Sequence, residues 1–106
     1  NVEIEFKRMD VRDFKINVHT VIMNPPFGYQ IPFSDSVFIE KAMELSSNIY
    51  MLHSKNAREY LIKKIGKKFS IVYEKDYKLN LPYTFKFHRK EIKSIDVRLY
   101  VLRVMK

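Results

Sequence analysis

The chain has 106 residues, no cysteine and a formal net charge of +8. Its length suffices for one small domain with a modest core, its apolar runs are too short to span a membrane, and no signal-peptide pattern opens it, so we expect a cytoplasmic protein. The lack of cysteine excludes disulfides and thiolate metal ligands, and the scattered His19, His53 and His88 predict no metal site.

The first half of the chain predicts a strand, a second strand, a helix and a third strand. Residues 2–6 alternate apolar and acidic side chains, as a half-exposed strand does. Residues 18–23 have the continuous apolar character of a central strand, which a double proline ends. An apolar face at helical spacing follows over residues 35–46, with Ser34 or Asp35 as its cap, and residues 48–53 form another strand pattern.

The second half predicts one helix and two further strands. Asn56 with Glu59 three residues on approximates a capping box, and Gly66 ends this helix. Residues 69–74 and 95–104 are strand-like, whereas residues 78–93 predict a loop or an irregular hairpin. The alternation of strands and helices predicts an α/β sheet covered by two helices.

The positive charge is concentrated in the second half of the chain. Residues 1–54 carry five Lys/Arg against seven Asp/Glu, whereas residues 55–93 carry twelve against four. Such a block favours contact with phosphates, because their neutralisation releases counterions. A solvated lysine-rich surface explains the charge equally well.

The motif Asn24-Pro25-Pro26-Phe27, directly after the predicted central strand, is the most informative part of the chain. Asn24 offers a neutral carbonyl acceptor, and the two prolines fix the backbone so that its carbonyls point in set directions. Phe27 adds an aromatic face. These features predict a cradle for a flat base that bears an amino group, and the alternative is a simple turn that ends the strand.

Several stretches resemble a known enzyme class. Asp10-Val11-Arg12-Asp13-Phe14, Asn24-Pro25-Pro26-Phe27-Gly28, and Asp35 followed by Phe38 resemble the class I S-adenosylmethionine-dependent adenine-N6 methyltransferases. Leu52-His53-Ser54, Arg58-Glu59, Leu81-Pro82-Tyr83 and Phe85-Lys86-Phe87-His88 are similar to one branch, the archaeal and eukaryotic methyltransferase-like protein five family. The resemblance implies a Rossmann-like α/β fold and methylation of the N6 amine of adenine in small-subunit ribosomal RNA.

The resemblance also implies roles for single residues. Asn24 and the carbonyl of Pro25 would accept the two N–H bonds of the target amine, Pro26 would hold the backbone, and Phe27 would stack on the extruded base. Asp10 and Val11, together with Asn24, would contact the cofactor S-adenosylmethionine. The alternatives are that Asp10 merely closes a strand and that Phe27 belongs to the core.

A basic and aromatic run near the end of the chain is the predicted RNA contact. It interleaves charge with stacking faces, which suits single-stranded RNA, and a solvated loop is the alternative. The residues are Lys86, Phe87, His88, Arg89 and Lys90.

The Gly-rich loop through which this family binds the methyl donor has no counterpart here, since Gly28 and Gly66 are the only glycines. We therefore expect residues 1–106 to be the C-terminal portion of a single methyltransferase domain, inactive alone and weak in donor binding. In the family's strand order, 3-2-1-4-5-7-6, the chain would supply strands 3 to 7, with strand 4 at an exposed edge.

An exposed edge invites pairing with another strand. We expect pairing with a second copy, with a missing N-terminal half, or with residues 2–6 of the same chain. A zinc-ribbon activator subunit is a further expected partner, by resemblance to eukaryotic members.

Two other functions remain open from the sequence. A glutamine-N5 protein methyltransferase would use the same acceptors for an amide nitrogen, although such enzymes usually carry tyrosine at the position of Phe27. A non-catalytic RNA-binding module would keep the basic run without the donor site.

Overall fold

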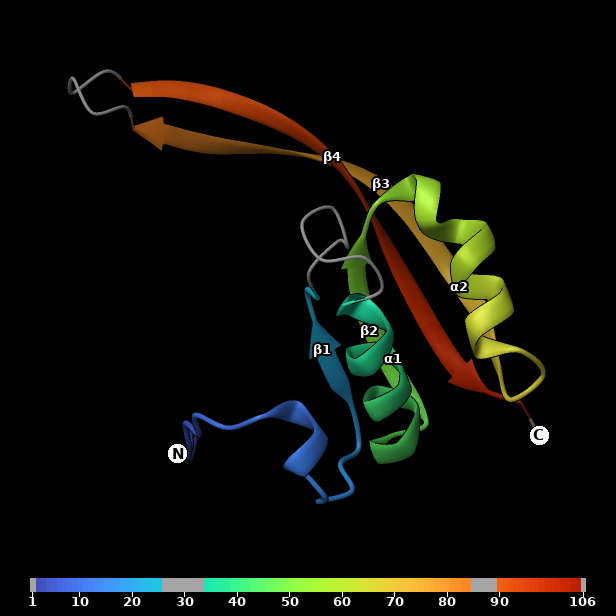
Figure 1. The fold of residues 1–106 in the computed structure, drawn as a ribbon. Helices are drawn as coiled ribbons and strands as arrows, with labels where there is room; N and C mark the ends of the chain where they lie inside the picture. The colour runs from blue at the N-terminus through green and yellow to red at the C-terminus, as the bar shows by residue number, and fades with distance from the viewer. Residues whose placement is uncertain (1, 26–33, 85–89, 106) are drawn as a thin grey trace.

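The computed structural model describes residues 2–25, 34–84 and 90–105 (Figure 1). Its elements, in chain order, are η1 (Val11–Asp13), β1 (Val21–Met23), α1 (Ser34–Leu45), β2 (Asn48–His53), η2 (Lys55–Ala57), α2 (Arg58–Ile65), β3 (Phe69–Thr84) and β4 (Lys90–Val104). The strands form one four-stranded sheet in the order β1-β2-β4-β3. The described helices are all too short or too polar to cross a membrane.

The sheet order matches the expected strands 4, 5, 7 and 6. β1 and β2 are parallel, and β4 is antiparallel to both β2 and β3. β1, β2 and β3 therefore run in the same direction, and their carboxyl ends lie at the same end of the sheet.

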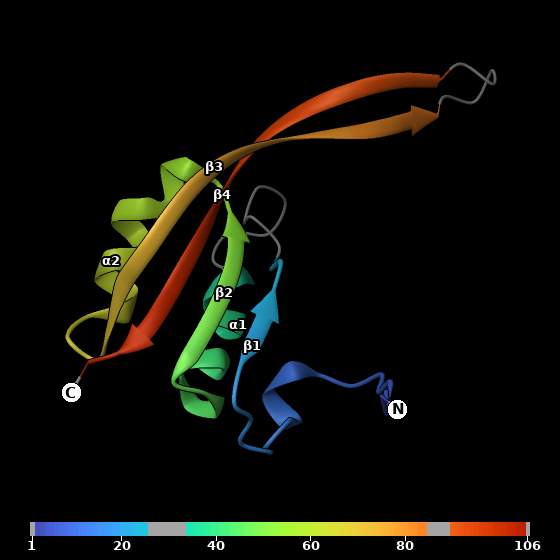
Figure 2. The same ribbon diagram turned by 180° about the vertical axis from the view of Figure 1, so that it is seen from behind.

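Both α-helices cover one face of the sheet, as the two ribbon views show (Figures 1 and 2). β2 alternates between buried and partly buried side chains, and the buried set faces the helices. The core on this face consists of Ile39 and Ala42 of α1, Leu61 and Ile65 of α2, and Ile49, Met51, Phe69, Tyr100 and Leu102 of the strands. No described helix covers the opposite face, where Ile22 is 84% exposed and Tyr73 50%.

The β3–β4 hairpin is far longer than predicted. The two strands pair from Phe69↔Val104 to Thr84↔Lys90, with one irregularity, between Ile71 and Tyr73. Of the two expectations for residues 78–93, the loop is wrong for residues 78–84 and 90–93, which continue the two strands, and the hairpin is present there but regular. Pro82 is tolerated because β3 is an edge strand, so its missing N–H interrupts no second ladder.

Only residues 98–103 of β4 pair with β2. The part of the hairpin that does not pair with β2 is a two-stranded extension, here called the arm: residues 77–84 and 90–97. Both ribbon views show the arm projecting away from the helices and the rest of the sheet (Figures 1 and 2).

The prediction that residues 2–6 form a strand is wrong. They belong to no sheet, and Val2, Ile4 and Phe6 are 87%, 71% and 92% exposed. An alternating pattern makes a strand only when a neighbouring strand supplies hydrogen-bond partners, and no described strand does so here. The expectation that this segment docks on the edge of β1 is wrong for the same reason, because β1 pairs with β2 alone among the described strands.

The strand predicted over residues 18–23 is shorter, since β1 begins only at Val21, and its prediction as a central strand is wrong because β1 lies at the edge of the described sheet. Three other boundaries agree closely, with one corrected cap. α1 and β2 lie within a residue of prediction, and Gly66 ends α2 with φ of +57°, a conformation that side chains disfavour. The predicted cap at Asn56 is wrong. The Ser54 hydroxyl instead accepts from the N–H of Asn56 at 3.1 Å, so a short 3-10 turn precedes α2, which begins at Arg58.

Candidate active site

Asn24 and Pro25 follow β1 directly, at the carboxyl end of the parallel strands. In open α/β sheets this end is where ligands bind. The Asn24 side chain is exposed and Pro25 is buried. The acceptor oxygen predicted from the sequence is therefore accessible, and the residue after it is anchored.

An apolar groove of about 640 Å³ adjoins Asn24 on the face of the sheet that the described helices leave open. Ile22 and Asn24 come from the end of β1, and the remaining walls come from β2, β3 and β4. Because the side chains of a strand alternate, Asn24 shares the face of Ile22 and Leu52. The lining residues are Ile22, Met23, Asn24, Tyr50, Leu52, Tyr77, Leu79, Val97 and Leu99.

The arm extends past the same end of the sheet as Asn24. β3 runs in the same direction as β1, so its carboxyl-terminal part, which belongs to the arm, extends beyond the carboxyl ends of β1 and β2. Figure 1 shows the arm reaching over this end. The predicted acceptor Asn24 and the start of the arm, which leads to the predicted RNA contact, thus lie at the same end of the sheet.

Several predicted site residues lie outside the described residues. Pro26 and Phe27 do so, and so do Lys86, Phe87, His88 and Arg89. Lys90 is described in its backbone alone, as the first residue of β4, paired with Thr84.

Asp10 and Val11 are held in a separate environment. The Asp10 carboxylate caps η1 and receives three hydrogen bonds from Arg12, from the backbone N–H and from the guanidinium, at 2.6–2.9 Å. These side-chain hydrogen bonds lower the pKa of Asp10 to about 2. Val11 lines a different pocket, of about 500 Å³, together with Phe14 and Phe38, and this pocket shares no residue with the groove beside Asn24.

A buried polar pair near Asn24 was missed by reasoning from the sequence. His53 at the end of β2 and Asp35 in the first turn of α1 are 3% and 5% exposed, and Nε2 of His53 lies 2.8 Å from Oδ2 of Asp35. The sequence pattern predicts only a scattered histidine at position 53 and a helix cap at Asp35. Both residues belong to the motifs that carry the family resemblance, which was the available signal.

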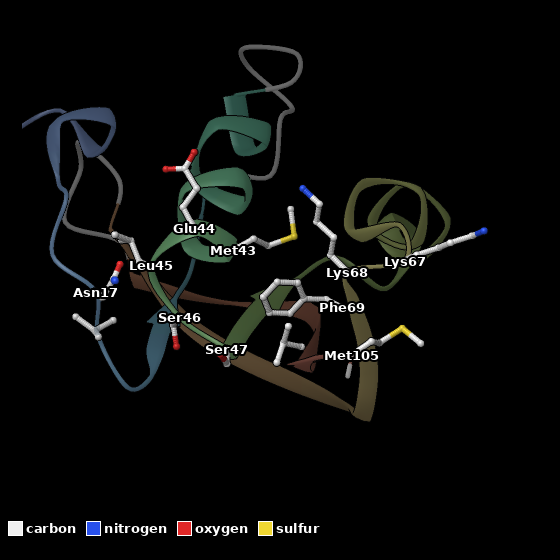
Figure 3. A pocket seen from close by; sticks show the side chains of 12 residues that line it. Asn17, Met43, Glu44, Leu45, Ser46, Ser47, Lys67, Lys68, Phe69 and Met105 are labelled. Atoms are coloured by element: carbon white, nitrogen blue, oxygen red, sulfur yellow. The ribbon is translucent and has the colours of Figure 1, made fainter.

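A second cavity, also of about 640 Å³, lies at the other end of the sheet (Figure 3). Its walls are formed by the end of α1, the start of β2 and the turn between α2 and β3. Glu44, Ser46, Lys68 and Phe69 are among the lining residues. The amino ends of parallel strands rarely bind ligands in this class of sheet. We therefore place the candidate site beside Asn24.

The chain resembles several known proteins, although no family model matches it. It is 39% identical over 83 residues to the rRNA N(6)-adenosine-methyltransferase Mettl5 of Drosophila melanogaster, covering 74% of this chain and 38% of the relative. The METTL5 protein of Danio rerio is 35% identical over 89 residues, covering 79% of this chain and 41% of the relative.

The chain is similar to the METTL5 methyltransferases over about three quarters of its own length. The chain is also 34% identical over 115 residues to an uncharacterized protein of Methanocaldococcus jannaschii. This match covers 94% of this chain and 52% of the relative. The chain thus spans about half the length, or less, of the curated relatives that it matches.

Solved structures also resemble the chain. A proposed RNA methyltransferase from Pyrococcus horikoshii superposes with a TM-score of 0.79 at 34% identity, covering 92% of this chain and 49% of that one. The complex of M1.HpyAVI with S-adenosylmethionine has a TM-score of 0.53 at 17% identity, covering 88% of this chain and 50% of that one, which shows a shared fold. The sheet is part of a class I methyltransferase fold, as expected.

Proposed function

We propose that the protein containing this chain transfers a methyl group from S-adenosylmethionine to the N6 amine of adenine in small-subunit ribosomal RNA, and that this chain supplies the site for the acceptor base. The observation that carries the proposal is the exposed Asn24 at the carboxyl end of β1, held beside buried Pro25 and next to an open groove. The names of the METTL5 relatives support the choice of adenine in ribosomal RNA.

The chemistry requires acceptors more than a base. The lone pair of the adenine amine is delocalised into the ring, so this nitrogen is a poor nucleophile until its hydrogens are held by acceptors. We infer that Asn24 Oδ1 and the carbonyl of Pro25 accept the two N–H bonds and aim the lone pair, with Pro26 fixing the backbone and Phe27 stacking on the base. Asn24 is neutral, so it serves as an acceptor without first removing a proton.

The described residues fit the acceptor side of the reaction better than the donor side. S-adenosylmethionine supplies an electrophilic methyl group when bound. Asp10, Val11 and Asn24 are the donor contacts that the resemblance implies. Gly66, the one glycine that the structure describes, ends α2 and is not part of a Gly-rich loop that could bind the donor. We propose that residues 1–106 are the C-terminal portion of one methyltransferase domain, and that the rest of a longer protein supplies the main donor contacts.

The arm is the proposed RNA-binding element. It projects from the end of the sheet where Asn24 lies, and its sequence continues into Lys86, Phe87, His88, Arg89 and Lys90 (Figure 2). Charge there would hold phosphates, and aromatic faces would stack on bases near the extruded adenine. We further propose that the unpaired edge of β1 meets the N-terminal half of the domain or a second copy. A zinc-ribbon activator stays a prediction.

The experiment that tests the proposal compares wild-type protein with Asn24→Ala, using the complete protein, labelled donor and ribosomal RNA. Removing one acceptor of the transition state should lower kcat by about 10²–10³-fold. RNA affinity, measured in parallel by filter binding, should stay close to that of the wild type, because the amide makes few contacts with the rest of the RNA. Full turnover by Asn24→Ala would show that the acceptor assignment is wrong.

A further inference from the structure

We propose that the buried Asp35–His53 pair is a positioning device that fixes the Asn24–Pro25 end of β1 for methyl transfer. The inference rests on the proposed function, since it assigns a role to residues that would not touch the substrate. Among the described residues the buried polar side chains are those of Asp35, Ser46 and His53, and two of these three contact each other.

The hydrogen bonds assign the proton on the His53 ring. The backbone N–H of Ser54 donates to Nδ1 of His53 at 2.7 Å, so Nδ1 must be the unprotonated nitrogen. The proton then sits on Nε2, which donates to Oδ2 of Asp35 at 2.8 Å. The ring is thereby held at both nitrogens, by the chain that follows β2 and by the first turn of α1.

The register of the sheet, extended past its last pair, aligns this pair with Pro25. Met23, the last residue of β1, pairs with Met51 of the parallel strand β2, and counting two residues on from each brings Pro25 opposite His53. Pro25 is buried, as His53 is, whereas the intervening residues Asn24 and Leu52 line the groove on the other face. The pair therefore lies on the helix-covered side of the sheet, at the level of the carbonyl that is the second proposed acceptor.

The pair also fixes the start of α1, the next described element after the Asn24–Pro25 end of the motif. β1 ends at Met23, and α1 begins at Ser34, next to Asp35. β1 is held to β2 by its ladder, and α1 is held to the last residue of β2 by the pair. The end of β1 and the start of α1 are thus both fixed to β2.

Stability alone explains the pair poorly. Replacing a buried polar pair by apolar side chains of similar volume is often neutral or stabilising. A hydrogen bond of fixed length and direction does what apolar contact does not: it prevents the start of α1 from sliding along β2. The third buried polar side chain, Ser46, makes a similar link at the opposite end, where its hydroxyl donates to the carbonyl of His19 at 2.8 Å.

The test uses the complete protein with Asp35→Ala, Asp35→Asn and Leu61→Ala. Asparagine keeps an oxygen that can accept from Nε2 of His53, and alanine does not. Leu61, fully buried in α2 and remote from the motif, provides the control for loss of stability. All rates are measured well below the lowest Tm, so that each variant is folded.

Asp35→Ala should lower kcat by about 10²-fold, the cost of a misplacement near 1 Å, while KM for RNA stays near the wild-type value. Asp35→Asn should restore most of kcat, and Leu61→Ala should keep the wild-type kcat despite its lower Tm. A wild-type kcat in Asp35→Ala, or no rescue by Asp35→Asn, would overturn the proposal.

A second readout does not depend on the reaction. The side-chain amide resonances of Asn24 should shift in Asp35→Ala and not in Leu61→Ala. Unshifted Asn24 resonances in Asp35→Ala would overturn the positioning role even if RNA is the substrate. Conversely, shifted resonances in a protein that methylates no RNA would support positioning while the proposed function fails.

Discussion

Asn24 and Pro25 are neighbours in sequence with opposite surroundings. Asn24 is exposed beside the groove, and Pro25 is buried on the side where the helices pack. The rigid backbone and the acceptor could be predicted, because proline restricts itself and the residue before it. The burial of Pro25 could not, since it depends on α1 and β2, which follow later in the chain.

Tyr100 shows how a single side chain supports this region. It is fully buried in β4, and its hydroxyl donates to the carbonyl of Ser54, directly after His53, at 2.9 Å. Its burial raises the pKa of the phenol, so the group stays a donor at neutral pH.

Tyr100→Phe should therefore destabilise the protein by about 1 kcal/mol, because it leaves the Ser54 carbonyl without this partner. Tyr73→Phe is the matched control. It removes the same kind of hydroxyl group, but from a side chain that is 50% exposed to water. Urea unfolding of the complete protein measures both changes. Equal losses in the two variants would contradict the role given to the Tyr100 hydroxyl.

The arm is the element in which the structure differs most from the sequence prediction. Its base carries an ion-pair network: Arg98 of β4 contacts Asp76 at 2.6 Å and Glu74 at 3.1 Å, and Arg58 of α2 contacts Glu74 at 2.8 Å. The hydrogen bond from Arg98 lowers the pKa of Asp76, and that from Arg58 lowers the pKa of Glu74. Both carboxylates thus stay charged at neutral pH and link the start of the arm to α2.

Lys86→Ala combined with Arg89→Ala should weaken RNA binding while kcat at saturating RNA changes little. If each residue neutralises one phosphate of a single strand, the slope of log affinity against log salt should fall by about 1.4. Binding isotherms at several salt concentrations measure this slope. An unchanged slope would mean that the basic run is a solvated surface.

Local signals explain which elements could be predicted. α1 and β2 carry apolar patterns bounded by clear breaks, and both agree within a residue. The arm lacks such a pattern: Lys78 and Asn80 are exposed, and Pro82 suggests a loop. Its strands are held by pairing with each other, which becomes visible only when both are in place. Residues 2–6 show the converse, a strand pattern without a partner.

At the scale of the whole molecule, the described residues with proposed roles at the acceptor site and the start of the arm lie at one end of the sheet. Asn24, the Asp35–His53 pair and the beginning of the arm all lie at the carboxyl ends of β1, β2 and the body of β3. The face that the described helices leave open carries exposed apolar side chains, among them Ile22 at 84% and Tyr77 at 40%. The order of the strands followed from the family resemblance, whereas the location of the groove required the structure.

The central claim is that the complete protein methylates the N6 amine of adenine in RNA through Asn24. The most direct measurement is to incubate it with S-adenosylmethionine labelled in the methyl group, ribosomal RNA and total protein, and then to identify the labelled product by mass spectrometry of nucleosides and amino acids. We predict label in N6-methyladenosine, and Asn24→Ala should form it about 10²–10³-fold more slowly. Label in the glutamine side chain of a protein, or RNA that is bound without being methylated, would contradict the claim.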